Sequence, residues 1–271
     1  MNIAYYMPFK PMGHKNPSGD LITGTELHDY LAHRKHSISL VSTLRCRWLY
    51  YRPHKWLQLL KERDKLIKQF RTDRPDLWLS YHSYYKAPDL LGASCCKKSN
   101  IPYVIFQGIY STKRRKQYKT LPGFLLNREV LLSASHIFTN KKRDLKNLKR
   151  ILPEEKLTYI APGIHPELFC FSEKARQQLR TLWHSDKKSV IMTAAMMRSG
   201  VKTEGVKRVI ESCAALIHRK LPIQLIVAGD GENRSALEKK ANDLIPGSVR
   251  FVGKIDRKEM HRYYSAADLF A

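Results

Sequence analysis

The sequence has 271 residues, 43% of them hydrophobic, which is enough to build one large domain or two ordinary domains with separate cores. Its 49 lysines and arginines exceed its 24 acidic residues, so the net charge of +25 favours phosphates, acidic lipids or polyanions as partners. The five cysteines show neither a CxxC pair nor a nearby histidine at metal-ligand spacing, which argues against a zinc site and a disulfide framework and favours a reducing cytoplasm.

The amino-terminal segment does not read as a signal peptide. Pro8 and Pro11 interrupt it where a signal peptide has its apolar core. No apolar run anywhere approaches membrane-spanning length. We therefore expect a cytoplasmic protein, with peripheral contact at the inner face of the membrane as a further expectation argued below.

The first half alternates short apolar runs with segments of helical periodicity. A strand is expected at residues 3–7 and a helix at 21–33. Further strands are expected at residues 36–42, 76–82, 102–108, 136–140 and 157–163. Because helical segments separate most of these strands, the natural arrangement is a parallel sheet.

The second half repeats this alternation. Strands are expected at residues 188–197, 222–230 and 248–253, and helices at 206–218, 234–244 and 258–266. The sequence therefore predicts an α/β protein of two Rossmann-like domains with parallel sheets, residues 1–165 and 166–271. A cleft between such domains is the default place for a ligand.

The stretch LIVAGDGENRSALEKKAND, residues 225–243, runs from an apolar segment through two glycines into a helical pattern. Glycines at the carboxyl end of a buried strand, just before a helix, can let backbone amides face an anion. The dinucleotide pattern GxGxxG is incomplete, because Arg234 stands at the place of the third glycine. By itself, this turn is better explained by the backbone freedom of glycine than by a bound phosphate.

Three segments of the second half give this turn a context. They are TAAMMRSGVKTEG from Thr193, LIVAGDGENRSALEKKA from Leu225 and VRFVGKIDRKEMHRYYSAADLF from Val249. In this order they resemble the retaining glycosyltransferases of family 4, which have the GT-B fold. The first half is similar less sharply, through PSGDLITGTELHDYLAHRKHSISLVS, IPYVIFQG and IAPGIHPELF. The resemblance implies transfer of a sugar from a nucleotide-sugar donor with retention of configuration, and neither a metal ion nor another cofactor.

The resemblance also assigns roles to charged residues of the second half. A departing nucleoside diphosphate gains negative charge, so fixed cations beside it stabilise the transition state. Arg198 and Lys202 are the candidates, both expected on a loop at a strand end. The alternative is that they are two solvated cations of a very basic protein. Donor binding is expected to involve Gly229, Asp230 and Gly231 as well.

Other positions are assigned by the same resemblance. Gly19 matches a small-residue loop that lets backbone amides approach the donor phosphates, although a tight turn explains it equally well. The residues Gly253, Lys254 and Ile255 are expected at the nucleotide base, with a plain strand end as the alternative.

The transferred sugar is expected to meet polar groups of the first domain. Many relatives carry a histidine where this sequence has Gln107, and glutamine can hold a hydroxyl but cannot titrate. His82 lies at the end of the preceding strand and is a second candidate for this role. The alternative is a structural histidine beside aromatic residues.

The sequence ends at AADLFA, where a new strand begins. In the family, the segment that follows carries a Pro- and Gly-rich loop and two glutamates that bind the ribose and the sugar of the donor. The second domain is therefore expected to be incomplete. The chain is then either a fragment or a truncated relative, and a noncatalytic or inactive GT-B scaffold is the alternative to an enzyme.

The excess positive charge is concentrated in three stretches. LRCRWLYYRPHKWLQLLKERDKLIKQFRT from Leu44 mixes aromatic residues with cations, and a set of apolar residues after Trp56 falls near one helical face, namely Leu59, Leu60, Leu66, Ile67 and Phe70. Such a helix suits an acidic membrane surface, and the alternative is that this face packs on the sheet.

STKRRKQYK and NKKRDLKNLKR add basic patches that suit a lipid-linked phosphate or an acidic glycan as acceptor. The same charge invites nucleic-acid binding. No zinc-finger spacing, RNP-like strand or clear helix-turn-helix pattern supports that alternative.

Overall fold

The computed structural model describes residues 1–14, 18–164 and 166–271, which form two compact units, Met1–Pro162 and Gly163–Ala271. The domain boundary expected between residues 165 and 166 lies three residues after the boundary between these units. It adjoins His165, which is outside the described residues. Each unit is described below by itself.

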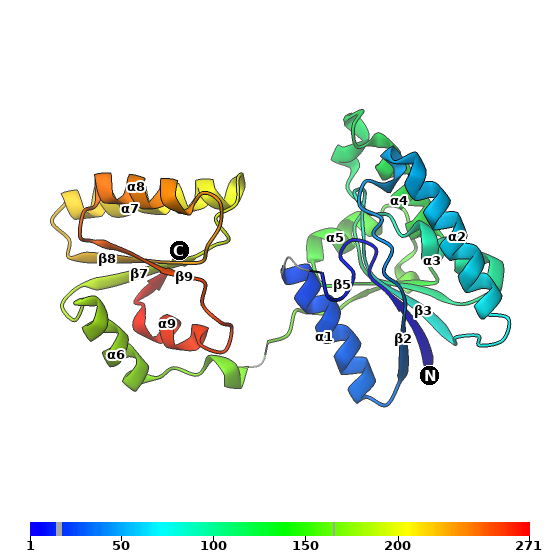
Figure 1. The fold of residues 1–271 in the computed structure, drawn as a ribbon, viewed down its shortest axis with the longest axis horizontal. Coiled ribbons are helices and arrows are strands. Elements are labelled where there is room, and N and C mark those ends of the chain that lie inside the picture. Colours follow the sequence, from blue (N-terminus) through cyan, green and yellow to red (C-terminus); the bar gives the residue numbers. More distant parts are fainter. Residues whose placement is uncertain (15–17, 165) are drawn as a thin grey trace. The chain divides into compact units, whose positions relative to one another are not determined.

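The first unit is built on one parallel sheet of six strands in the order β2-β1-β3-β4-β5-β6 (Figure 1). Its strands are β1 (Asn2–Tyr6), β2 (Ser37–Ser42), β3 (Leu77–Ser83), β4 (Tyr103–Gly108), β5 (His136–Thr139) and β6 (Leu157–Tyr159). Each strand begins within one residue of its predicted position. The chain continues from β1 to β2 on one side and to β3 on the other, so the topological switch point lies between β1 and β3.

Helices cover both faces of this sheet. They are α1 (Gly19–His33), α2 (Pro53–Gln69), α3 (Leu90–Ser99), α4 (Leu121–Leu132) and α5 (Lys142–Leu148). Strand residues alternate between the two faces, so Tyr6 packs in a core with α2, α3 and α4, whereas Tyr5 belongs to the core beside α1. Three short 3₁₀ turns complete the unit, η1 (Leu49–Tyr51), η2 (Thr112–Lys116) and η3 (Glu154–Lys156).

Helix α2 settles one of the alternatives left open by the sequence. Leu59, Leu66 and Phe70 are buried in the first unit's core, and Trp56 and Ile67 pack against that core. The apolar face of this helix therefore packs inside the protein. This was the second of the two alternatives, the first being contact with an acidic membrane surface. Leu60 was predicted on the same face but is 39% exposed.

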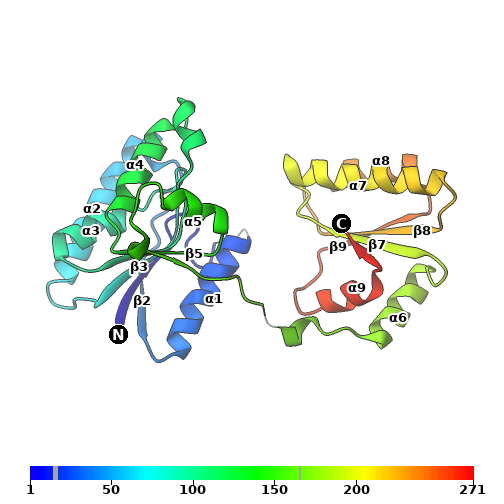
Figure 2. The ribbon, with the colours of Figure 1, turned by 180° about the vertical axis from the view of Figure 1, so that it is seen from behind.

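The second unit has a parallel sheet of four strands in the order β10-β7-β8-β9, again with helices on both faces (Figure 2). Its strands are β7 (Ser189–Ala194), β8 (Ile223–Ala228), β9 (Val249–Gly253) and β10 (Leu269–Phe270). Its helices are α6 (Glu173–Trp183), α7 (Val201–His218), α8 (Arg234–Leu244) and α9 (Met260–Ala266), preceded by the turn η4 (Pro166–Phe169). Helices α7 and α8 pack on one face of the sheet and α6 and α9 on the other.

The start of α7 corrects the sequence-based prediction. This helix begins at Val201, five residues before the predicted start at Val206, so Lys202 lies in its first turn and not on a loop. Gly200, with a φ of 111°, ends the preceding loop in a conformation that only glycine adopts readily. Residues 201–205 show no apolar periodicity from which the helix start could be predicted.

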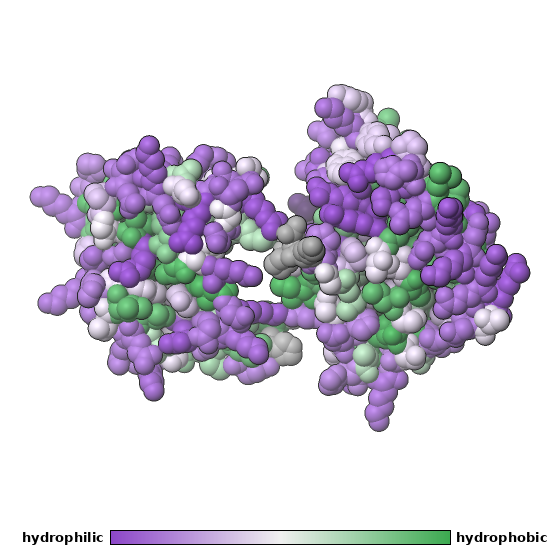
Figure 3. All heavy atoms as spheres, viewed as in Figure 1, coloured by the Kyte–Doolittle hydropathy of each residue, from purple (hydrophilic) through white to green (hydrophobic). Residues whose placement is uncertain are grey.

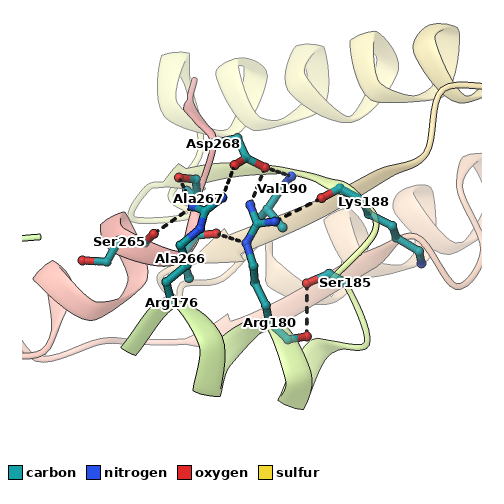
Figure 4. A network of polar contacts seen from close by, with 9 residues as sticks. All are labelled: Arg176, Arg180, Ser185, Lys188, Val190, Ser265, Ala266, Ala267 and Asp268. Carbon is teal, nitrogen blue, oxygen red and sulfur yellow. Dashed lines mark hydrogen bonds and ion pairs between the residues drawn. The ribbon is translucent and has the colours of Figure 1, made fainter. Parts of the chain in front are cut away.

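Asp268, which follows α9, ties α6 to the sheet of the second unit (Figure 4). Its carboxylate accepts hydrogen bonds from the Arg176 guanidinium at 2.6 Å, from the Arg180 guanidinium and from the Val190 amide at 2.8 Å. Arg180 also donates to the carbonyl oxygen of Ala266 at 3.0 Å. Burial raises the pKa of Asp268, but these donors outweigh it and hold the pKa at about 2.

Among the described residues, no helix combines the length and the apolar character that crossing a bilayer requires. The structure thus contains two α/β units with open parallel sheets, and the sites of interest lie at the carboxyl ends of their strands.

Candidate functional site

The carboxyl edge of the second sheet is formed by two loops in close contact. The loop after β7 lies against the turn from Gly229 to Gly231, and a Cβ at Gly229 would collide with the carbonyl oxygen of Ala195. A Cβ at Gly231 would come within 2.6 Å of the carbonyl oxygen of Met197. Both glycines have positive φ angles, 114° and 154°. Glycine is therefore required here so that two backbones can touch.

Backbone hydrogen bonds fix this contact. The Met197 amide donates to the Asp230 carbonyl at 3.0 Å, and the Asn233 amide donates to the Met197 carbonyl at 3.0 Å. The Gly229 amide donates to the Gly253 carbonyl at 2.7 Å, and the Gly231 amide donates to the Asp230 carboxylate at 2.8 Å. The two glycine amides, which the sequence suggested for an anion, thus already have partners, and the reading of this turn as a backbone requirement is the correct one for them.

The two cations expected at the leaving group are exposed, Arg198 on the loop that this contact holds in place and Lys202 in the helix that follows. Arg198 lies in the loop after β7, beside the first turn of α7 with Lys202. The carbonyl oxygen of Arg198 accepts a hydrogen bond from the Thr203 hydroxyl at 2.7 Å, which ties the loop to the helix. Gly200 precedes this helix and offers no side chain to cap it. The first turn of the helix contains Lys202 and also Glu204, and the Glu204 carboxylate is paired with Lys207 at 2.9 Å, so the uncapped amide groups and Lys202 supply the positive charge of this terminus.

Glu232 contacts this loop directly. Its carboxylate accepts a hydrogen bond from the Ser199 amide at 2.9 Å, and this bond, with the charge of Arg198, lowers its pKa. The Asn233 side chain donates to the Ser199 hydroxyl at 3.2 Å. Both contacts come from the turn after β8, so the turn positions the backbone around Arg198 while leaving the guanidinium exposed.

The third predicted segment of this edge, Gly253 to Ile255, opens onto a pocket. Gly253 ends β9 with a φ of 73°, and its carbonyl oxygen receives the Gly229 amide. Lys254 and Ile255 line a surface pocket of about 320 Å³. The other lining residues come from α6, from the loop between β9 and α9 and from α9, namely Leu179, Asp256, Glu259, Arg262 and Tyr263. The structure therefore brings two of the three predicted base-binding residues, Lys254 and Ile255, to a pocket one strand away from the turn of Gly229 to Gly231, and Gly253 does not line it.

In the first unit, His82 and Gln107 occupy neighbouring places on adjacent strands. Tyr81 pairs with Phe106 and Ser83 with Gly108, so the two candidates lie opposite each other between these pairs. Both have positive φ angles, 70° for His82 and 68° for Gln107, although neither is glycine. Non-glycine residues in this region are strained and cluster at functional sites.

His82 lies in a small pocket at the switch point of the first sheet. The pocket is lined by residues that follow β1, by α1 and by β3, namely Met7, Phe9, Lys10, Asp20, Tyr81 and His82. The Nδ1 atom of His82 lies 3.4 Å from a carboxylate oxygen of Asp20, and neither ring nitrogen makes a hydrogen bond of good geometry. His82 lowers the pKa of Asp20, against the opposing effect of burial. A buried imidazole with available nitrogens is suited to bind a hydroxyl group.

Gln107 is buried and paired on one side only. Its amide nitrogen donates to the Asn140 side chain, which follows β5, while its carbonyl oxygen has no hydrogen-bond partner. Asp20 and Asn140 thus lie beside His82 and Gln107, although the sequence did not single them out. We call these four residues the polar edge of the first unit. The signals that point to them are an acidic residue in the first turn of a helix and a polar residue directly after a buried strand.

Gly19 lies at the first position of α1, where Ser18 caps the helix by accepting a hydrogen bond from the Leu21 amide at 3.3 Å. A Cβ at Gly19 would meet no atom within 4 Å, and its φ is not positive. Neither a tight turn nor close packing therefore requires this glycine. Its predicted role beside a phosphate stays a prediction, and residues 15–17 before it lie outside the described part.

Metal binding was not expected from the sequence. Within residues 1–14, 18–164 and 166–271, no three His, Cys, Asp or Glu side chains gather in a way that could hold a metal ion.

Comparison with known proteins identifies the second unit. Residues 181–271 match the family described as glycosyl transferases group 1. This match contains the Arg198 loop, the glycine turn and the segment from Gly253 to Ile255. No curated protein matches the chain.

Solved structures resemble the whole chain. HepE from Anabaena in complex with UDP has a TM-score of 0.71 at 15% identity, over 100% of this chain and 73% of that chain. A glycosyltransferase from Rickettsia africae has a TM-score of 0.64 at 14% identity, over 99% and 72% of the two chains. WaaG, a glycosyltransferase involved in lipopolysaccharide biosynthesis, also has a TM-score of 0.64, at 13% identity and over 98% and 74%.

This protein thus spans about three quarters of the length of these structures. At such identities the likeness shows the fold, and it confirms the predicted pair of Rossmann-like units. The chain has the GT-B fold, and its residues 181–271 match the model of the glycosyl transferases group 1 family.

Proposed function

We propose that this protein transfers a sugar from a nucleotide-sugar donor to a glycan or lipid-linked acceptor, as a family 4 glycosyltransferase that retains the configuration of the sugar. The observation that carries the proposal is the carboxyl edge of the second sheet. There the Arg198 loop, the glycine turn and Gly253 are joined by backbone hydrogen bonds, within the segment that matches the group 1 glycosyltransferases. HepE, the structural neighbour with the TM-score of 0.71, was solved with UDP bound.

The donor diphosphate is assigned to the loop after β7. An exposed guanidinium and the uncapped amino terminus of α7 present positive charge at one place, and Lys202 adds a second cation there. A cation in the first turn of a helix is disfavoured by the helix dipole, and a bound anion would remove this repulsion. Positive charge held in this way stabilises a leaving diphosphate without a metal ion, so no metal is required by the proposed mechanism.

The nucleotide base is assigned to the pocket beside Lys254 and Ile255. Its volume of about 320 Å³ is within the range of small-molecule sites, and apolar side chains line it together with charged ones. Asp230 belongs to the same edge, where its carboxylate is engaged by the Gly231 amide. We assign Asp230 to the support of the glycine turn within the donor site.

The polar edge of the first unit is assigned to sugar hydroxyls. Gln107 offers an unpaired carbonyl oxygen and His82 two ring nitrogens, all of them buried. Desolvated groups of this kind bind a hydroxyl strongly because they gain the partner they lack. The proposed location is the cytoplasm, with the exposed cations that flank α2 available to an acidic surface.

The experiment that tests the proposal compares Arg198→Ala with Arg208→Ala, a second exposed arginine on the same part of the chain. With UDP-glucose as the donor, we expect donor turnover to fall about 100-fold in Arg198→Ala, because one fixed donor to a developing charge is worth that much. In both variants the free energy of unfolding is expected to stay within about 0.5 kcal/mol of that of the unmodified protein, since both side chains are exposed. Equal turnover in the two variants would remove Arg198 from the site. A protein that binds donor but turns over none would be a noncatalytic GT-B scaffold.

A further inference from the structure

A second feature of the first unit, outside the polar edge, is a surface where three basic segments meet. They are residues 44–56, 84–88 and 109–121, none of which contains an aspartate or glutamate. We call its central part the basic aromatic surface, formed by Trp48, Tyr50, Tyr51, Tyr85, Lys86, Arg114 and Lys119. In Figure 3 mostly hydrophilic or intermediate side chains cover the tip of the first unit where residues 111–120 lie in Figure 1.

Hydrogen bonds hold the three segments together. The Trp48 amide donates to the Lys86 carbonyl at 2.7 Å, and the Tyr50 hydroxyl donates to the Tyr85 carbonyl at 2.9 Å. The Tyr51 hydroxyl donates to the Lys119 carbonyl at 2.9 Å. The surface is therefore assembled in the folded protein and does not depend on one flexible loop.

The aromatic rings support cations on this surface. The Lys86 ammonium lies 5.8 Å from the ring centre of Trp48 and 5.7 Å from that of Tyr85. The Arg114 guanidinium lies 4.5 Å from the ring centre of Tyr85, and its Nε is buried without a hydrogen-bond partner. Cation–π contacts of this kind fix the positions of the charges, and among the described residues no carboxylate forms an ion pair with either cation. An unpaired buried donor is costly unless a ligand satisfies it.

A chain of ring contacts connects this surface to the polar edge. The His82 ring stacks on Tyr84 at 4.7 Å between centres, Tyr84 meets Tyr85 at 5.5 Å, and Tyr85 meets Trp48 at 6.0 Å. His82 and the cations Lys86 and Arg114 thus belong to one connected aromatic cluster, and a ligand with one end at His82 and another at these cations would span that cluster.

We infer that the acceptor of the proposed transferase carries a phosphate ester, which Lys86 and Arg114 bind while the acceptor end reaches His82. This inference rests on the proposed function. A guanidinium fork and an ammonium within one rigid cluster suit a phosphate, whose oxygens accept from both. The ring faces of Trp48 and Tyr85 are occupied by these cations and by edge-to-face neighbours, so they do not offer the open stacking platform that single-stranded nucleic acids use.

The test measures binding of full-length protein to maltoheptaose that carries a phosphate ester, and to unmodified maltoheptaose, by calorimetry. The double variant Lys86→Gln/Arg114→Gln removes the two ring-supported cations. The control Lys97→Gln/Lys98→Gln removes the same charge from exposed lysines in the last turn of α3, at the opposite edge of the parallel sheet. UDP-glucose binding is measured in the same samples, so that failure of the acceptor inference is distinguished from failure of the proposed function.

We expect the phosphorylated chain to bind, the unmodified chain to bind at least tenfold more weakly, and the double variant to lose at least tenfold in affinity with donor binding unchanged. The control should change affinity less than twofold. Phosphatidylcholine vesicles with phosphatidic acid form a second arm. Binding to these vesicles alone, with the same dependence on Lys86 and Arg114, supports the inference and assigns the phosphate to a lipid. Equal losses in the double variant and the control, measurable and equal affinity for both sugars, binding to neither the phosphorylated sugar nor the vesicles, or preferential binding of single-stranded RNA would each overturn it.

Discussion

Single residues at the strand ends of this protein are held in conformations that their side chains alone do not favour. His82 and Gln107 both have positive φ angles at facing positions of β3 and β4, and both keep buried polar atoms without partners. Such strain persists only where surrounding structure imposes it, and it is a mark of functional sites. The sequence pointed to Gln107 through a resemblance and to His82 through its place at the end of the preceding strand, but it carried no sign of their backbone conformation, because non-glycine residues give no local signal for a positive φ.

The glycines of the second unit show the opposite case, in which the residue type itself carried the information. Gly229 and Gly231 are necessary because the loop after β7 touches them, and this contact involves residues more than thirty positions earlier in the chain. The sequence predicted a turn with glycines but not what lies against it.

Substitution of Gly229 tests this contact. We expect Gly229→Ala to lower the free energy of unfolding by about 2–4 kcal/mol, because the new Cβ collides with Ala195 and the φ of 114° disfavours alanine. Chemical denaturation monitored by circular dichroism provides the measurement. The matched control is Gly205→Ala, at a helical position of α7 where a Cβ meets no atom beyond the backbone of its own helix. This substitution should raise the free energy of unfolding by about 0.5–1 kcal/mol. If Gly229→Ala lowers the free energy of unfolding by no more than about 0.5 kcal/mol, as an ordinary surface substitution does, the close approach of the two backbones is refuted.

At the scale of elements, strands were the easiest to predict. Buried strands such as β8, all six of whose residues are buried, read as continuous apolar runs between turn signals. The start of α7 was missed because its first turn, from Val201 to Glu204, carries mostly exposed side chains and follows a glycine instead of a capping serine. The periodicity of α2 was visible, whereas only the structure shows that it packs inside the core.

Two substitutions on α2 test that packing. Leu66 is 1% exposed and Leu57 is 64% exposed on the same helix. We expect Leu66→Ala to cost about 2–5 kcal/mol of unfolding free energy through lost burial and the cavity left behind. Leu57→Ala should stay within about 0.5 kcal/mol. Thermal or urea unfolding of both variants checks this, and equal effects would mean that α2 does not bury the face described above.

The carboxylate of Asp268, which joins α6 to β7, should make a contribution to the free energy of unfolding that depends on pH. In the folded protein its pKa is about 2, below the ordinary value of 3.8, because of Arg176, Val190 and Arg180. A depressed pKa stabilises the fold above the ordinary value, and this contribution disappears as the pH falls from about 4 to 2. We expect Asp268→Asn to cost about 2 kcal/mol at neutral pH, since charged hydrogen bonds to the partly buried Arg180 are weakened.

The measurement is the stability difference between the unmodified protein and Asp268→Asn at several pH values. The difference should shrink steadily below pH 4. Asp186→Asn, at an exposed aspartate of the same unit, should show little difference at any pH. A difference for Asp268 that grows on acidification would contradict the ion-pair network drawn in Figure 4.

At the scale of the whole molecule, alternation of strands and helices was enough to predict two parallel-sheet units and their approximate division. The motifs that the resemblance assigned to the donor lie within the group 1 match, and the role of their residues in donor binding stays a prediction. The basic aromatic surface was visible only as scattered charge, because its three segments are joined by contacts such as that of Trp48 with Lys86. Tertiary contacts of this kind leave no periodic pattern.

The central claim is that a nucleotide binds at the carboxyl edge of the second sheet. The most direct measurement follows amide chemical shifts of the isotope-labelled protein during titration with UDP-glucose. We predict the largest changes in Met197 to Lys202, Gly229 to Gly231 and Gly253 to Ile255, with smaller changes for Arg198→Ala at the same donor concentration. Saturable changes confined to other parts of the chain, or none at millimolar donor, would contradict the account.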